Sequence, residues 1–122
     1  MDWSFRNDQP IYSQLIQRLT EAIVSGVYAP GEKLPSVREL ALEAGVNPNT
    51  VQRSLTELER EGLVFSQRTA GRFVTGDVSM IENAKLRLAD QCVENFLSEM
   101  AKLGCGRDEV IALLQGRKEE EP

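Results

Sequence analysis

The chain has 122 residues, of which 41% are hydrophobic and 27% are charged, and its net charge is −5. This length supports one compact core with a short appendage rather than two large domains. The sequence contains no histidine, which removes the commonest general base and argues against an enzyme, while the negative charge argues against indiscriminate binding to nucleic acid.

The two cysteines, Cys92 and Cys105, are too few and too far apart for a disulfide framework or a zinc site. We expect both to serve as small apolar side chains, and we expect neither a metal nor a cofactor. No apolar run approaches the length needed to span a bilayer, and the first residues lack the basic-then-apolar pattern of a signal peptide. We therefore expect a cytoplasmic protein without a membrane partner.

The first predicted element is an amphipathic helix over residues 10–25, whose apolar residues recur at spacings of three and four. Pro10 suits its first turn and Gly26 suits its end. The turn at residues 29–31 and the extended pair Leu34-Pro35 follow this helix.

Two further helices are predicted with a short break between them. Ser36 and Glu39 have the spacing of a capping box, so a short helix should begin at Ser36 and end before Gly45. Asn47 and Pro48 repeat the start signal for a third helix, which ends at Gly62. A short helix, a glycine-containing break and a longer helix are typical of a helix-turn-helix.

Residues 63–67 and 72–75 have the character of two strands, and the loop 68–71 between them contains a glycine. A hairpin after a helix-turn-helix predicts a winged helix over residues 1–76.

A long helix over residues 79–103 and a short one over residues 108–114 complete the chain, separated by the break 104–106. The long helix carries two adjacent apolar rows, more than the short helix can cover, so a second copy of the chain is the simplest partner. The alternative is that this helix folds back onto its own winged domain. The candidate dimer contacts are Leu86, Leu88, Ala89, Val93, Phe96, Leu97 and Met100. We assign residues 77–116 to a helical dimerisation segment and residues 117–122 to a flexible tail.

The fold class is therefore mostly α, of the α+β type: a winged helix-turn-helix followed by two helices. The motifs Pro10-Ile11-Tyr12-Ser13-Gln14-Leu15, Leu34-Pro35-Ser36-Val37-Arg38-Glu39-Leu40-Ala41, Val46-Asn47-Pro48-Asn49-Thr50-Val51 and Gly71-Arg72-Phe73 closely resemble, in this order, the N-terminal domain of the GntR family of bacterial transcription regulators. The resemblance covers about residues 8–76. The short helical tail is similar to that of the YtrA-type subfamily, whose members dimerise through it.

In a helix-turn-helix the second helix enters the major groove with its first residues toward the base edges. The third predicted helix therefore supplies candidates for base contacts, and Arg38 lies where the family contacts DNA. The wing adds two arginines and a glycine that allows close approach to a phosphate or to the minor groove. The candidate DNA contacts are Ser36, Arg38, Asn47, Asn49, Thr50, Gln52, Arg53, Arg68, Gly71 and Arg72.

Each candidate also has a purely structural interpretation. Arg53 and Glu57 are spaced for a surface ion pair, Asn47 suits a helix cap, and Arg38 suits a solvated charge.

The leading functional hypothesis is a dimeric regulator, by resemblance usually a repressor, that binds an inverted-repeat DNA operator. The alternative is a winged helix that has lost DNA binding and serves as a protein-interaction module, which the acidic total charge permits. About forty residues after the wing leave little material to enclose an effector pocket, so a groove at the dimer interface is where an unidentified small-molecule effector would bind.

Overall fold

The computed structural model describes residue 1 and residues 3–117, and the chain divides into two compact units between Lys85 and Leu86. The elements in chain order are α1 (Ile11–Val24), α2 (Val37–Ala44), α3 (Pro48–Arg60), β1 (Val64–Gln67), β2 (Gly71–Val74), α4 (Val78–Lys102) and α5 (Arg107–Gln115). Each observed element lies within a few residues of its predicted range. The mostly α fold with a winged helix is thus confirmed.

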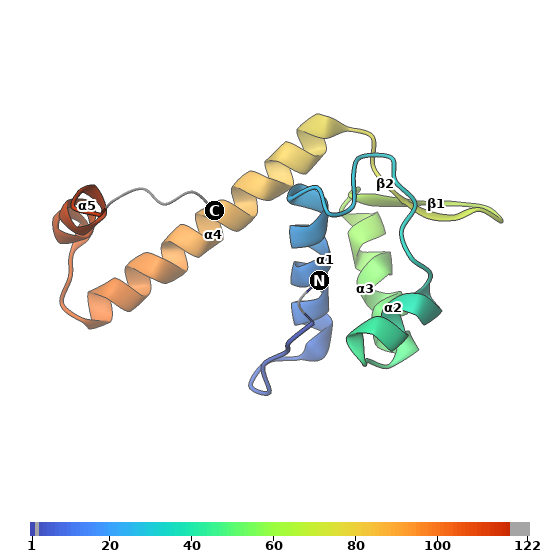
Figure 1. Cartoon of the computed structure of the whole chain (residues 1–122), viewed down its shortest axis with the longest axis horizontal. Helices are drawn as coiled ribbons and strands as arrows, with labels where there is room; N and C mark the ends of the chain where they lie inside the picture. The colour runs from blue at the N-terminus through green and yellow to red at the C-terminus, as the bar shows by residue number, and fades with distance from the viewer. Residues whose placement is uncertain (2, 118–122) are drawn as a thin grey trace. The chain divides into compact units, whose positions relative to one another are not determined.

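The core of the first unit lies among the three N-terminal helices, and α3 packs against both α1 and α2 (Figure 1). Apolar side chains from each helix meet there because each presents one apolar face. The fully buried members from the helices are Leu15, Leu19, Ile23, Leu40, Val51, Leu55 and Leu58.

Local capping signals set the start of α2 and α3, as expected. The Ser36 hydroxyl accepts a hydrogen bond from the amide of Glu39, and the Glu39 carboxylate accepts one from the amide of Ser36, which completes the capping box. Gly45 ends α2 in the left-handed conformation (φ 67°), where a residue without Cβ avoids steric strain. Asn47 caps α3, and Pro48 occupies its first turn.

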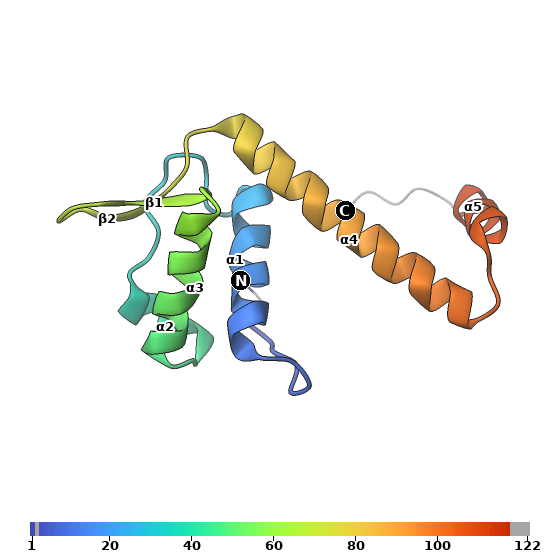
Figure 2. The same cartoon turned by 180° about the vertical axis from the view of Figure 1, so that it is seen from behind.

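The wing is an antiparallel hairpin in which Val64 pairs with Val74 and Gln67 with Gly71. It projects away from α1, α2 and α3 in both views of the chain (Figures 1 and 2). The connection from α1 to α2 runs along its base, where the amide of Leu34 donates to the carbonyl of Arg72 (2.9 Å) and the amide of Val74 to the carbonyl of Glu32 (2.9 Å). These bonds tie the segment before α2 to the wing.

The first turns of α4 pack on the winged unit. The Asp77 carboxylate accepts hydrogen bonds from the amides of Ser79 and Met80, and Ile81 and Ala84 are buried in the core. The hairpin ends near residue 76, where the sequence suggested a domain boundary, but compact packing continues to Lys85 because of these two apolar residues.

The second unit consists of the rest of α4 and α5. Val110 of α5 is its one buried hydrophobic residue among those described. Of the tail that we expected to be flexible, residues 118–122 lie outside the described part of the chain. None of the helices in the described part combines the length and hydropathy required to cross a bilayer.

Candidate nucleic-acid interface

The start of α3 carries the candidates for base contacts. Its buried stripe faces α1 and α2, which leaves the opposite face open to solvent. On that face Asn49, Gln52 and Arg53 are exposed, and Thr50 is half-buried. The Asn47 side chain accepts a hydrogen bond from the amide of Asn49 (2.8 Å) and therefore caps α3, as its purely structural interpretation predicts.

Arg53 stacks on an aromatic ring from another helix. Its guanidinium carbon lies 4.4 Å from the ring centroid of Tyr12 in α1. Glu57, the ion-pair partner suggested by the sequence, instead pairs with Arg60 at 2.6 Å. The stacking restricts the Arg53 side chain while its edge stays exposed for hydrogen bonds. Sequence reasoning missed Tyr12 because nothing local links it to Arg53.

The start of α2 presents Ser36 and Arg38. The Ser36 hydroxyl is engaged in the capping box, although the residue is exposed. The hydrogen bond from the Ser36 amide is the largest of the effects that lower the pKa of the Glu39 carboxyl, so this carboxylate is charged near neutral pH. Arg38 is exposed and makes no hydrogen bond or ion pair within the described residues. Its guanidinium is thus available to a ligand.

The loop of the wing carries Arg68, and Gly71 begins β2 directly after this loop; both residues are exposed. Between them Thr69 adopts φ +67°, and Gly71 has φ +111°, a conformation in which any side chain is strained. A backbone without Cβ at Gly71 leaves space for close approach by another group.

Arg72 turns back toward α3 rather than outward. Its Nε donates to the Glu59 carboxylate, which also accepts a hydrogen bond from the Ser66 hydroxyl (2.6 Å). The Ser66 and Arg72 hydrogen bonds, in that order, hold the pKa of Glu59 below its usual value. The structure therefore places Arg72 in a link between the wing and α3, apart from the other arginine of the wing.

The unpaired cations of the first unit gather around α2, α3 and the wing. Ion pairs engage Arg6, Arg18, Arg60 and Arg72. Among the described residues of this unit, the basic side chains without an ion-pair partner are Lys33, Arg38, Arg53, Arg68 and Lys85. Four of these five lie on or beside α2, α3 and the hairpin, so positive charge is available there despite the negative total.

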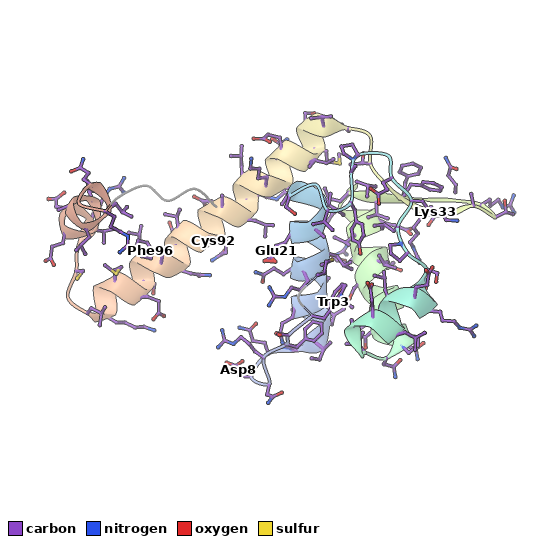
Figure 3. The ribbon with its side chains drawn as sticks, in the orientation of Figure 1. Trp3, Asp8, Glu21, Lys33, Cys92 and Phe96 are labelled. Carbon is purple, nitrogen blue, oxygen red and sulfur yellow. The ribbon has the colours of Figure 1, made fainter. Side chains whose placement is uncertain are left out.

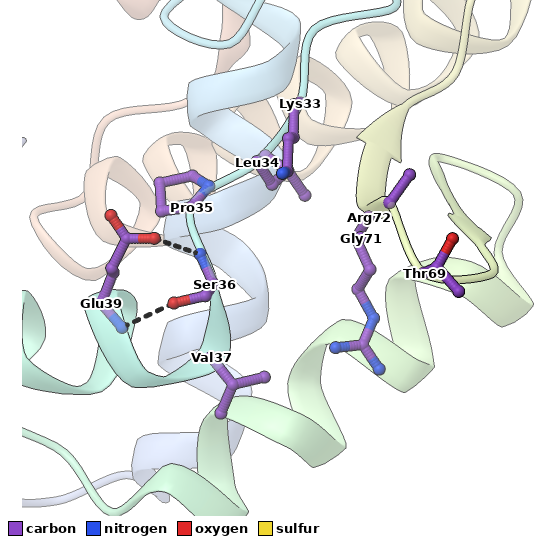
Figure 4. Close-up of a pocket in the computed structure, with 10 residues that line it drawn as sticks. Lys33, Leu34, Pro35, Ser36, Val37, Glu39, Thr69, Gly71 and Arg72 are labelled. Carbon is purple, nitrogen blue, oxygen red and sulfur yellow. Dashed lines mark hydrogen bonds between the residues drawn. The ribbon is translucent and has the colours of Figure 1, made fainter.

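Lys33 is the cation that sequence reasoning did not select. It forms an isolated antiparallel bridge with Phe73 and lines a cleft between the start of α2 and the wing (Figures 3 and 4). In the sequence it is a single lysine before Leu34-Pro35, and only the fold brings it beside Gly71.

The second unit contains the candidate dimer contacts, which form an apolar surface rather than a polar one. Leu86, Val93 and Phe96 are 57%, 52% and 42% exposed. Ala89 is also exposed, and three candidates are half-buried: Leu88, Leu97 and Met100. An apolar cavity of about 240 Å³ separates α4 from α5, and Phe96 points from α4 into this region (Figure 3). Within the described residues, no group of three or more His, Cys, Asp or Glu side chains is placed to hold a metal ion.

Comparison with known proteins agrees with this geometry. Residues 11–74 match the gntR family of bacterial regulatory proteins. The chain is 37% identical to the uncharacterised HTH-type transcriptional regulator YhcF of Bacillus subtilis over 111 residues. This alignment covers 91% of this chain and 92% of YhcF. The chain is also 45% identical over 85 residues to the transcriptional repressor YtrA of Bacillus subtilis, covering 70% of this chain and 61% of YtrA.

Solved structures extend the similarity to the helical tail. A GntR family transcriptional regulator from Listeria monocytogenes has a TM-score of 0.84 and 40% identity, covering 93% of this chain and all of that one. The DNA-binding domain of AraR, solved in complex with operator ORE1, has a TM-score of 0.53 and 26% identity, covering 62% of this chain and 94% of that domain.

The relatives named above are transcription regulators rather than enzymes, in agreement with the expectation from the histidine-free sequence. The family match covers α1 to β2, which are the elements that carry the candidate DNA contacts. The chain therefore belongs to the gntR family of bacterial regulatory proteins and is a DNA-binding transcription regulator.

Proposed function

We propose that the protein is a cytoplasmic homodimeric repressor of the YtrA type that binds an inverted-repeat operator. The observation that carries the proposal is the exposed start of α3, flanked by unpaired cations on α2 and on the wing. An exposed recognition helix between positive charges fits a major groove bordered by two phosphate backbones.

The side chains divide into two groups by their expected contacts. Asn49, Gln52 and Arg53 lie on the exposed face of α3, where amide and guanidinium groups can pair with base edges. Arg38 and Arg68 lie on the flanking elements, so we assign them to phosphates.

We assign dimerisation to the apolar surface of residues 77–116, chiefly to α4 beyond Lys85. Leucine, valine and phenylalanine side chains exposed on one short helical unit favour burial against a second copy. Most soluble oligomers are symmetric, and two-fold symmetry would present the two recognition helices to the two half-sites of an inverted repeat.

The cavity between α4 and α5, at about 240 Å³, is smaller than the range of about 300–1,000 Å³ typical of small-molecule sites. We therefore expect it to receive side chains of the second copy, and we place any small-molecule effector at the interface between copies.

The relatives support the proposal. YtrA of Bacillus subtilis is a repressor, the AraR domain was solved with an operator, and the Listeria regulator matches the tail as well as the winged helix.

The test is a binding titration with duplex DNA that the wild-type protein selects from a random-sequence pool, repeated over a series of salt concentrations. We expect an inverted repeat in the selected sequences and a steep fall of affinity with salt, because phosphate contacts release counterions. A protein that selects no sequence and shows no saturable binding would instead fit the protein-interaction alternative.

A further inference from the structure

The cleft between the start of α2 and the wing has a volume of about 310 Å³ (Figure 4). Its walls come from the segment before α2, the first residues of that helix and the loop of the hairpin. The lining residues that bear on its chemistry are Lys33, Ser36, Glu39, Gly71 and Arg72. The cleft therefore lies between α2 and the wing, the two elements that flank the recognition helix α3.

The position of Lys33 in this cleft depends on its backbone bridge to β2 and on the space beside Gly71. The isolated bridge to Phe73 fixes its main chain against β2. A Cβ built on Gly71 would lie 3.1 Å from Cε of Lys33 and 3.8 Å from its Nζ. The missing side chain at Gly71 thus leaves room for the lysine chain, which places the ammonium group at the wing.

Two cations line the cleft, and they differ in how they are engaged. The Arg72 guanidinium is bound to Glu59, so its charge is neutralised within the fold. Lys33 has no ion pair or hydrogen bond through its ammonium group among the described residues. Glu39, a carboxylate that lines the same cleft, forms no ion pair with Lys33 among the described residues and accepts a hydrogen bond from the Ser36 amide. Lys33 therefore retains donor capacity toward solvent.

The start of α2 contributes Val37 to the same wall. The amide of Val37 makes no hydrogen bond within the described residues, because the capping box engages only those of Ser36 and Glu39. An ammonium group and a free amide in the first turn of a helix, both from residues that line one cleft, are suited to bind a phosphate oxygen.

We propose that Lys33 is a DNA-contacting residue that binds a backbone phosphate of the operator in the cleft between α2 and the wing. The inference rests on the proposed function, since DNA seated on α3 must also pass α2 and the hairpin. The phosphate contact would fix how closely the wing approaches the duplex. Because phosphates occur in every sequence, Lys33 adds affinity without sequence preference.

The experiment compares Lys33→Gln, Lys33→Arg and Lys85→Gln in the full chain. Lys85→Gln is the matched control, because it removes the same charge from an exposed lysine of α4 that does not line the cleft. The probes are the selected operator duplex and a scrambled duplex of the same length, each titrated over a salt series by fluorescence anisotropy. Thermal unfolding of each variant checks that the fold is retained.

We expect Lys33→Gln to weaken binding to both duplexes by a similar factor, on the order of tenfold near physiological salt. The slope of the logarithm of the binding constant against the logarithm of the salt concentration should also become less negative, by about 0.9 for each bound subunit. Lys33→Arg should keep most of the affinity because it keeps a cation, and Lys85→Gln should bind like the wild type.

The proposal is overturned if Lys33→Gln matches Lys85→Gln in affinity and salt dependence, which would mean that Lys33 only balances the charge of Glu39. It is also overturned if Lys33→Arg loses as much affinity as Lys33→Gln, or if only the selected duplex is affected, since that result indicates base reading. Failure of the wild-type protein to bind either duplex would instead contradict the proposed function itself.

Discussion

Among single residues, Arg53 is a proposed base contact whose exposed side chain is oriented by an aromatic ring in the protein without DNA. Its guanidinium rests on the Tyr12 ring, and such exposed contacts stabilise by about 0.5–1 kcal/mol. A side chain already held in place loses less conformational entropy on binding than a free one. Tyr12 is therefore a positioning residue for a candidate base contact.

We predict that Arg53→Ala weakens binding to the selected operator by about 1–3 kcal/mol and relaxes the preference at one base pair of each half-site. Arg60→Ala is the matched control, because Arg60 also lies on α3 but is paired with Glu57 near its end. Competition with single-base variants of the operator measures the preference. Equal loss on every sequence would assign Arg53 to a phosphate, and unchanged binding would limit its role to the contact with Tyr12.

Glu59 makes the link between the wing and α3 dependent on pH. The hydrogen bonds from Ser66 and Arg72 lower its pKa from the ordinary value of 4.5. A lowered pKa in the folded state means that the stabilisation is fully present above about pH 4.5 and is lost as the pH falls through the folded pKa.

We predict that Glu59→Gln lowers the free energy of unfolding at pH 7 by on the order of 1 kcal/mol, because the charged partner of Arg72 is lost. The difference from the wild type should shrink as the pH falls below about 4.5. Urea unfolding of both proteins at a series of pH values measures this difference in the free energy of unfolding. A difference that stays constant down to the acid limit would show that the ionised carboxylate does not stabilise the wing.

Among the elements, α2 contains a residue that caps the helix and also lies on the proposed DNA-binding surface. Ser36 caps the helix through its hydroxyl, yet it is exposed and lines the cleft beside the wing. The two roles can be separated because aspartate also caps helices well, whereas its charge repels phosphate.

We predict that Ser36→Ala lowers the free energy of unfolding by about 1 kcal/mol through loss of the cap. Ser36→Asp should keep the stability close to that of the wild type but weaken DNA binding, most strongly at low salt. Thermal unfolding and anisotropy titrations measure the two effects. Normal DNA binding by a stable Ser36→Asp variant would show that no phosphate comes near the start of α2.

Two kinds of interaction attach the hairpin to the rest of the first unit. Backbone hydrogen bonds from Leu34 and Val74 join it to the segment before α2, and the Arg72–Glu59 pair joins it to α3. Its loop, with Arg68, has no side-chain hydrogen bond in the described structure. The base of the wing is thus fixed to the helices while its loop stays available to DNA.

At the scale of the whole molecule, the two compact units differ in how they bury apolar surface. The first contains the continuous core, whereas the second buries only Val110 among its described hydrophobic residues. Leucine, valine and phenylalanine exposed in the second unit favour association, so the stability of the chain should depend on its concentration.

We predict that Val93→Glu shifts the protein from dimer to monomer in sedimentation experiments and removes the concentration dependence of its thermal midpoint. Ser98→Glu is the matched control, since it places the same charge on the polar side of α4. The monomeric variant should lose most of its operator affinity, because the second half-site then binds independently. A Val93→Glu variant that remains dimeric would place the interface elsewhere.

The elements of the fold and most of the exposed candidates could be predicted from the sequence, because their determinants are local. The capping box at Ser36, the Asn47 cap and the left-handed Gly45 act within a few residues, and the apolar periodicity repeats within single helices. These signals placed α2, α3 and the wing, and with them the surface on which Asn49, Gln52 and Arg68 lie.

The pairing of individual side chains depends on contacts that form when the chain folds. The fold pairs Arg72, a candidate DNA contact, with Glu59, and it places Lys33 beside Gly71 by joining the segment before α2 to the hairpin. The sequence alone thus determined a winged helix with an apolar tail. Which cations remain free for DNA depends on contacts between residues distant in the chain, and packing of the core sets those contacts.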